Sequence, residues 1–143
     1  MKKGLSQNSD SFVSKNAHLI GASPFDRLAH GQTLEQDKLS KFLADIQNKI
    51  HEGFAKDAEE RCFDILENYA NSIDTQAQIN QLLSVALEKQ GLFADSFKAL
   101  QPYESPRVTV SLTEETQAAV LTQLAISYAN LNEAPKAIAL LNS

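Results

Sequence analysis

Apolar residues recur at spacings of three and four over most of the chain after residue 37, a pattern typical of amphipathic helices that each bury one face. Most of these stripes are long enough for several helical turns. In chain order, they comprise Leu39, Phe42, Leu43, Ile46 and Ile50; Ala55, Ala58, Cys62, Ile65, Leu66 and Tyr69; Ile79, Leu82, Leu83, Ala86 and Leu87; Phe93, Phe97 and Leu100; Val120, Leu121, Leu124, Ala125, Tyr128 and Leu131; and residues 134–142.

Short breaks at Gly53, Gly91 and Asn132 join these stripes in pairs. Glycine and, next to it, asparagine accept the left-handed backbone that ends many helices. The three positions are 38 and 41 residues apart. A repeat of this length indicates helical hairpins stacked as a solenoid.

Local signals place the helix starts and the connections. Thr33 and Gln36 form a capping-box pattern, Asp74 or Thr75 is expected to cap the third helix, and Ser111 is expected to cap the helix after it. Pro102 is expected to end the helix that follows Gly91. The segment 107–110 has β-branched residues and could be extended, but it is too short to build a sheet.

The first residues of the chain have a different character, because residues 1–17 are polar and show no periodicity. Ser23 and Pro24 then suit the start of a short helix. We therefore expect residues 1–32 to be a flexible N-terminal arm with a short helix near 24–30, and residues 33–143 to be the helical domain. Leu19, Phe25 and Leu28 are apolar enough to suggest that the arm occupies a groove of the same chain.

The paired stripes resemble the tetratricopeptide repeat, and the last pair matches its pattern best. That family places a large apolar residue, a Leu–small pair and an aromatic before the turn, then a small and a large residue after it. The matching residues are Leu121, Leu124, Ala125, Tyr128, Asn132, Ala137 and Leu141 in the last pair; Leu83, Ser84, Leu87, Gly91, Phe93, Ser96 and Leu100 in the middle pair; and Gly53, Ala58 and Cys62 in the first. The resemblance implies an all-α, right-handed helical-hairpin solenoid of about three TPR-like hairpins.

In that family the first helix of each hairpin lines a concave groove that binds a partner protein or peptide. By helical phase, the expected groove residues are Leu43, Gln47, Ile50, Gln78, Gln81, Val85, Lys89, Thr122, Ile126, Ala129 and Asn130. Only Lys89 and Asn130 could grip a terminal carboxylate, so the carboxylate-clamp type of groove is disfavoured. A surface of amides and apolar groups better suits an extended peptide backbone or an amphipathic helix. The alternative is that some of these residues only pack against a neighbouring helix.

The end of the sequence, residues 134–142, presents apolar residues that have no following repeat. A solenoid needs a cover for its last apolar face. Ile138, Leu140 and Leu141 are therefore expected to form an open-end interface, covered either by further repeats or by a second chain as a homodimer or heteromer.

Charge and chemistry narrow the function classes. Residues 34–143 hold nine Lys and Arg against sixteen Asp and Glu, a net charge of −7, which disfavours nucleic acid as a partner. Cys62 is the only cysteine, and we expect it to be a buried apolar residue. The histidines at 18, 30 and 51 are too scattered for a metal site. Asp57, Glu60, Asp64 and Glu67 are expected to form a solvated face.

These features predict a non-enzymatic protein–protein interaction module with no cofactor, no membrane insertion and a cytoplasmic location. A small chaperone of a secretion system is the narrower hypothesis, on the basis of size, acidity and the lack of catalytic motifs. Two alternatives stay open, namely a scaffold segment of a longer repeat protein and a regulatory subunit of an enzyme whose site is assembled across an interface.

Overall fold

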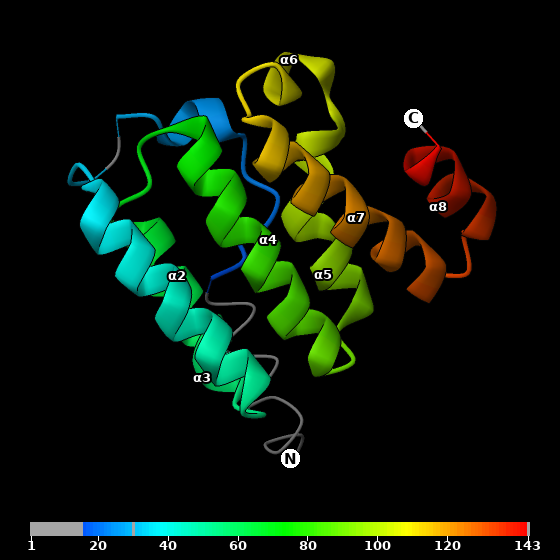
Figure 1. The fold of residues 1–143 in the computed structure, drawn as a ribbon, viewed down its shortest axis with the longest axis horizontal. Helices are drawn as coiled ribbons and strands as arrows, with labels where there is room; N and C mark the ends of the chain where they lie inside the picture. Colours follow the sequence, from blue (N-terminus) through cyan, green and yellow to red (C-terminus); the bar gives the residue numbers. More distant parts are fainter. Residues whose placement is uncertain (1–15, 30, 143) are drawn as a thin grey trace.

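A computed structural model of the chain describes residues 16–29 and 31–142, and these residues form helices and no strand. The fold is therefore all-α, as the sequence predicts. The elements, labelled as in Figure 1, are the 3₁₀ helices η1 (Pro24–Arg27) and η2 (Gln101–Glu104) and the α-helices α2 (Gln36–His51), α3 (Ala55–Asn68), α4 (Ile73–Lys89), α5 (Phe93–Leu100), α6 (Pro106–Thr109), α7 (Glu114–Asn130) and α8 (Ala134–Leu141).

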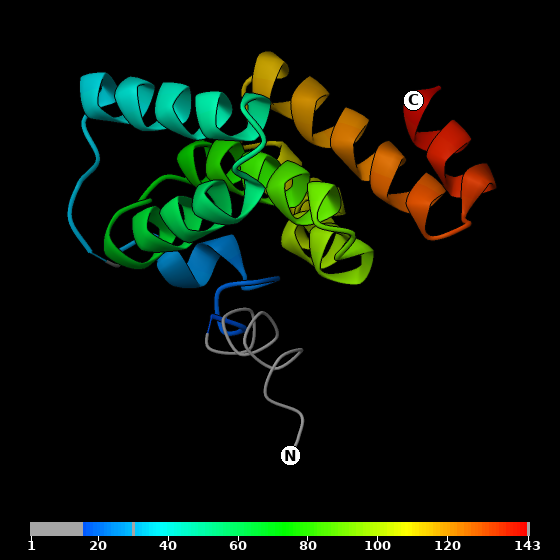
Figure 2. The ribbon, with the colours of Figure 1, turned by 90° about the horizontal axis from the view of Figure 1, so that it is seen from below.

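The long helices pair as three consecutive hairpins, α2 with α3, α4 with α5 and α7 with α8. The first helices of the hairpins lie side by side, because α4 contacts both α2 and α7 (Figure 1). The second helices pack against the first helix of the next hairpin, α3 on α4 and α5 on α7. Seen from below, α2 and α7 lie at one side of the molecule and residues 16–29 lie at the other (Figure 2).

The three hairpin turns share one conformation, which confirms the turn positions predicted from the sequence. Gly53, Gly91 and Asn132 have φ angles of 91°, 79° and 64°. In each turn the next residue donates its backbone N–H to the carbonyl five positions earlier, with N···O distances of 2.7, 3.0 and 2.7 Å. This hydrogen bond defines the Schellman motif, in which a left-handed residue satisfies the last carbonyls of a helix.

Two clusters of buried apolar side chains hold the hairpins together. The first lies between α2, α3 and α4 and contains Ile46, Ile65 and Leu83, each with no solvent exposure. The second joins the start of α4 to α5, η2, α6 and α7. Because α4 contributes to both clusters, it is the central helix of the fold.

Small residues let the paired helices approach closely. Between α4 and α5, the buried Ser84 and Ser96 hydroxyls each donate to the other residue's backbone carbonyl, at 2.8 and 2.7 Å. Between α7 and α8, Ala125 and Ala137 are both buried. These are the small positions of the predicted repeat pattern, and burial of small side chains allows close interhelical contact.

The three predicted N-caps, at Thr33, at Asp74 or Thr75, and at Ser111, are wrong. Helix α2 begins at Gln36 with Glu35 before it and no capping hydrogen bond, so the Thr33 capping box does not form. Ser72, and not Asp74 or Thr75, caps α4 by accepting from the N–H of Thr75 at 2.9 Å.

Thr113, and not Ser111, caps α7 in the same manner, accepting from the N–H of Thr116 at 3.2 Å. The segment 107–110, which could be extended by its sequence, is instead helical over residues 107–109 in α6, because Pro106 occupies the first turn of that helix, where proline fits. Where several Ser, Thr or Asp residues lie close together, the sequence alone does not show which of them caps the helix.

The described part of the predicted N-terminal arm lies against the body. Leu19 belongs to the first core cluster, and the backbone carbonyl of Pro24 accepts a buried hydrogen bond from Gln76 at 3.0 Å. Arg27 donates to the carbonyl of Leu66 near the end of α3, at 2.7 Å. The short helix expected near 24–30 is a 3₁₀ helix ending at Arg27. Residues 1–15 and His30 of the predicted arm lie outside the described residues.

Candidate functional site

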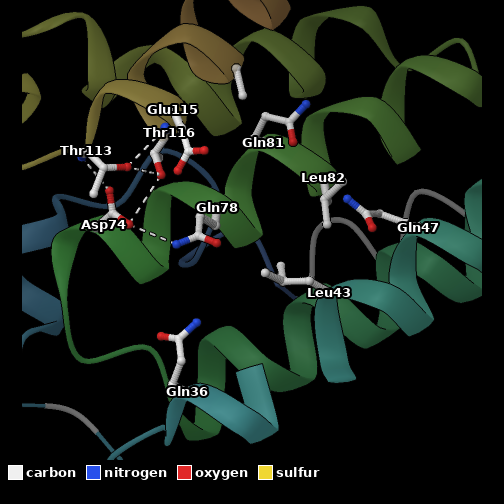
Figure 3. Close-up of a pocket in the computed structure, with 11 residues that line it drawn as sticks. Gln36, Leu43, Gln47, Asp74, Gln78, Gln81, Leu82, Thr113, Glu115 and Thr116 are labelled. Atoms are coloured by element: carbon white, nitrogen blue, oxygen red, sulfur yellow. Dashed lines mark hydrogen bonds between the residues drawn. The ribbon is translucent and has the colours of Figure 1, made fainter. Parts of the chain in front are cut away.

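A groove of about 440 Å³ crosses the first helices of the three hairpins. Its lining is mostly polar and comes from α2, α4 and α7 and from the loop before α7 (Figure 3). The lining residues are Gln36, Leu43, Gln47, Asp74, Gln78, Gln81, Leu82, Thr113, Glu115, Thr116 and Ala119. Two of them carry a negative charge and none is Lys or Arg, so the groove is acidic.

Asp74 joins α4 to the start of α7 at one end of this groove. Its Oδ1 accepts the backbone N–H of Thr113 at 2.8 Å. Its Oδ2 accepts from Gln78 at 2.8 Å and from the hydroxyl of Thr116 at 3.2 Å (Figure 3). A carboxylate beside a helix N-terminus also interacts favourably with the helix dipole. Asp74 therefore fixes the position of α7 relative to α4.

The other amides of the groove are available for a ligand. Gln36, Gln47 and Gln81 make no hydrogen bond to another residue drawn in Figure 3. Each amide offers two donors and one acceptor, which match the alternating N–H and C=O groups of a peptide backbone. Leu43 and Leu82 add apolar surface between these amides.

Four of the predicted groove residues line this groove, namely Leu43, Gln47, Gln78 and Gln81. The others lie on the same three helices but outside its lining; they are Ile50, Val85, Lys89, Thr122, Ile126, Ala129 and Asn130. Among these, Ile126 is 38% exposed, which is high for an isoleucine in the middle of a helix. In the described part of the chain, the Asn130 Nδ2 is buried and has no hydrogen-bond partner.

Sequence reasoning missed the end of the groove formed by the first helical turns. Gln36, Asp74 and Glu115 follow the same spacing of 38 and 41 residues as the turns at Gly53, Gly91 and Asn132. Applying that period to each residue of the first turn would have identified them. The interpretation of Asp74 as an N-cap concealed its contact with α7.

The groove is not occupied by the apolar residues of the N-terminal segment. Leu19 is buried in the first core cluster, while Phe25 lines a different cavity with Gln101, Pro102 and Arg107. The Arg107 guanidinium lies over the Phe25 ring, 5.1 Å from its centroid. The hypothesis that Leu19, Phe25 and Leu28 enter the groove is therefore wrong, because this segment packs on the side of α3 and α5 instead (Figure 2).

The single cysteine is buried in the core, as the sequence predicts. Cys62 has no solvent exposure, and burial together with the nearby charge of Glu59 raises the pKa of its thiol. A thiol with a raised pKa forms little thiolate and is a poor nucleophile. The predicted acidic face of α3 is exposed at Asp57, Glu60, Asp64 and Glu67.

Glu59 is a buried acid that the sequence does not reveal. Its side chain has no solvent exposure; Oε1 accepts from Gln90 at 2.7 Å, and Oε2 has no hydrogen-bond partner among the described residues. Burial raises the pKa of Glu59, and the hydrogen bond from Gln90 opposes that rise. The side chain lies between helices, away from the groove, and its contacts are those of a structural residue.

The described residues contain no group of three or more His, Cys, Asp or Glu side chains placed to hold a metal ion. His18 hydrogen-bonds to Glu67 at 2.9 Å, and His51 is exposed at the end of α2. In the same part of the chain, no helix has both the length and the apolar character needed to cross a membrane.

The predicted open-end surface is apolar and accessible on α8. Ile138 is 58% exposed and Leu141 is 64% exposed, whereas Leu140 packs partly against the second core cluster. Among the described residues, α8 has extensive contacts only with α7. Two of the three predicted interface residues are thus accessible to another molecule.

Comparison with protein-family models, with curated proteins and with solved structures found no match to this chain.

Proposed function

We propose that this chain is a helical-repeat protein of the tetratricopeptide type and that its groove binds a segment of a partner protein without catalysing a reaction. The observation that carries the proposal is the groove across α2, α4 and α7, lined by glutamine amides and leucines. The shared turn geometry at spacings of 38 and 41 residues supports the repeat assignment. Such a lining suits a polypeptide better than a small charged metabolite, because amides pair with peptide groups.

A comparison of groove variants tests this proposal. Gln47→Ala combined with Gln81→Ala removes two amides that make no hydrogen bond to the other groove residues, so the fold should be retained. The partner protein is first isolated by its binding to the wild-type chain and is then purified. We expect the double variant to bind this partner about tenfold more weakly than the wild type does, because two hydrogen bonds are lost. Isothermal titration calorimetry with the purified partner gives the affinity.

The matched control is Asn48→Ala, which removes an exposed amide of α2 beside Gln47 but outside the groove. Its affinity should stay within about twofold of the wild type. Equal affinity of the double variant and the wild type for every purified partner would contradict the groove assignment.

The narrower hypotheses differ in their genetic context. A gene beside those of a secretion apparatus favours the chaperone, whereas a longer reading frame favours the scaffold segment. Saturable turnover by the purified chain would overturn the non-enzymatic proposal and favour the enzyme-subunit alternative.

A second proposal concerns the open-end surface formed by Ile138, Leu140 and Leu141. We propose that a second copy of the chain covers it, since exposed apolar side chains that lie together favour association. The variant Ile138→Asp combined with Leu141→Asp should sediment as a monomer under conditions where the wild type is a dimer, with unchanged helicity by circular dichroism. A wild type that is monomeric at all concentrations would contradict the dimer and leave a different protein as the cover.

A further inference from the structure

The face that α4 and α7 present at the groove changes character along the two helices, from two acidic residues at one end to two apolar residues near the other, where Lys89 follows one turn beyond Val85. Asp74 and Glu115 line the groove in the first turns of α4 and α7. Val85 and Ile126 each follow eleven residues later on the same two helices. Eleven residues are about three helical turns, so each acidic residue and its apolar counterpart lie on the same face, about 16 Å apart.

The two helices repeat this arrangement in register. Asp74 and Glu115 are 41 residues apart, as are Val85 and Ile126, and α4 lies beside α7 (Figure 1). The two carboxylates are thus at one end of adjacent parallel helices, and the two apolar side chains are at the other. Ile126 is 38% exposed and Val85 is partly exposed, so both can contact a ligand.

The charges of the groove are not neutralised by its own residues. No Lys or Arg lines it, and the hydrogen bonds that Asp74 accepts come from neutral donors, namely Gln78, Thr113 and Thr116. Glu115 is exposed, and Figure 3 draws no hydrogen bond to its carboxylate. An anionic ligand would be repelled here, whereas a cationic side chain would gain two nearby carboxylates.

We propose that the partner segment is basic at one end and apolar at the other, with a Lys or Arg beside Asp74 and Glu115 and a large apolar side chain on Val85 and Ile126. This inference rests on the proposed function of the groove and specifies its ligand. An extended peptide covers about 16 Å in about five residues, and a helix covers it in about eleven. The spacing between the basic and apolar residues therefore distinguishes the two binding modes.

Selection of random peptides on the full-length chain tests this inference. Peptides displayed on phage are enriched on the wild type, sequenced, synthesised with a fluorophore and measured by fluorescence anisotropy. We expect the enriched sequences to carry Lys or Arg at a fixed spacing from an aromatic or aliphatic residue. Their affinity should fall when NaCl is raised from about 50 mM to about 500 mM, because salt screens the charge pair.

Charge reversal at Glu115 locates the contact. Glu115→Lys should weaken the enriched peptides by about tenfold or more, and Ile126→Asp should do the same at the apolar end. Glu114→Lys is the matched control, because Glu114 is the preceding exposed residue of α7 and does not line the groove. It should change affinity by no more than about twofold. Asp74 is left intact because it also holds α7 in place.

The possible outcomes separate this inference from the proposed function. The charge assignment is overturned if the enriched peptides are neutral or acidic, or if they bind the Glu115→Lys and Glu114→Lys variants with equal affinity. If the binding of those peptides still depends on Gln47 and Gln81, the proposed function of the groove stands. Peptides insensitive to all groove variants overturn both. Retained helicity and unfolding midpoint of each variant, measured by circular dichroism, establish that a loss of binding is local.

Discussion

Replacing Gly31 by alanine is expected to lower the free energy of unfolding by about 3 kcal/mol or more, one of the largest effects of a single methyl group in this chain. Gly31 has a φ of +75°, which costs an L-residue energy in any surroundings. A Cβ at this position would also collide with the backbone carbonyl of Asn68, which cannot move aside as a flexible side chain can.

This collision is costly because the segment around Gly31 supplies hydrogen-bond donors to the last carbonyls of α3. The N–H of Gln32 donates to the carbonyl of Asn68 at 2.9 Å, and Arg27 donates to the carbonyl of Leu66. The last carbonyls of a helix have no partner within the helix and need such donors. An alanine at residue 31 would push this segment away and leave those carbonyls without partners. Thermal unfolding followed by circular dichroism should show a midpoint lowered by about 10 °C.

Gly53 provides a control with the same backbone strain and no collision. Its φ is +91°, and a Cβ at this position would have no heavy atom of another part of the chain within 4 Å. Gly53→Ala should therefore cost only about 1 kcal/mol, the price of a left-handed alanine. Equal destabilisation by Gly31→Ala and Gly53→Ala would contradict the close contact between Gly31 and the backbone carbonyl of Asn68.

The turns of this fold were predictable from the sequence because each depends on one residue type. Only glycine or asparagine readily accepts the left-handed φ found at Gly53, Gly91 and Asn132, and their spacing exposed the three hairpins. The helix caps were not predictable, because Ser72, Asp74 and Thr75 are all good capping residues within four positions. Contacts between residues distant in sequence decide which of them caps α4, because the Asp74 carboxylate accepts a hydrogen bond from Thr113, 39 residues away.

Part of the candidate site could be predicted from the sequence, and part of it could not. Helical phase placed Leu43, Gln47, Gln78 and Gln81 on the concave face, and these residues line the groove. The acidic end was missed because Asp74 and Glu115 come together only when α4 and α7 are neighbours. The position of residues 16–29 could not be predicted from the sequence either. This segment is short and has no periodicity, so its apolar and hydrogen-bonding groups do not indicate which helices they contact.

Replacing Asp74 by alanine is expected to lower the free energy of unfolding by about 2–3 kcal/mol, because hydrogen bonds to a charged, partly buried acceptor are worth more than neutral ones. The substitution leaves the N–H of Thr113 and the hydroxyl of Thr116 without their acceptor. Urea unfolding gives the change. Glu60→Ala, on the exposed face of α3 and beyond its first turn, is the control and should stay within about 0.5 kcal/mol of the wild type.

The double variant Asp74→Ala with Thr116→Val separates the contact between α4 and α7 from other effects of the substitution. If the hydrogen bond between these two side chains holds the helices together, the two single effects should not add, and a coupling of about 1 kcal/mol is expected. Additive effects would contradict this role. Because α4 and α7 form two walls of the groove, Asp74→Ala should also speed amide hydrogen exchange in the first turn of α7 more than in α2. Asp74 then has a structural part, because its hydrogen bonds link α4 to the start of α7, and it also supplies one of the two negative charges that line the groove, the other being that of Glu115.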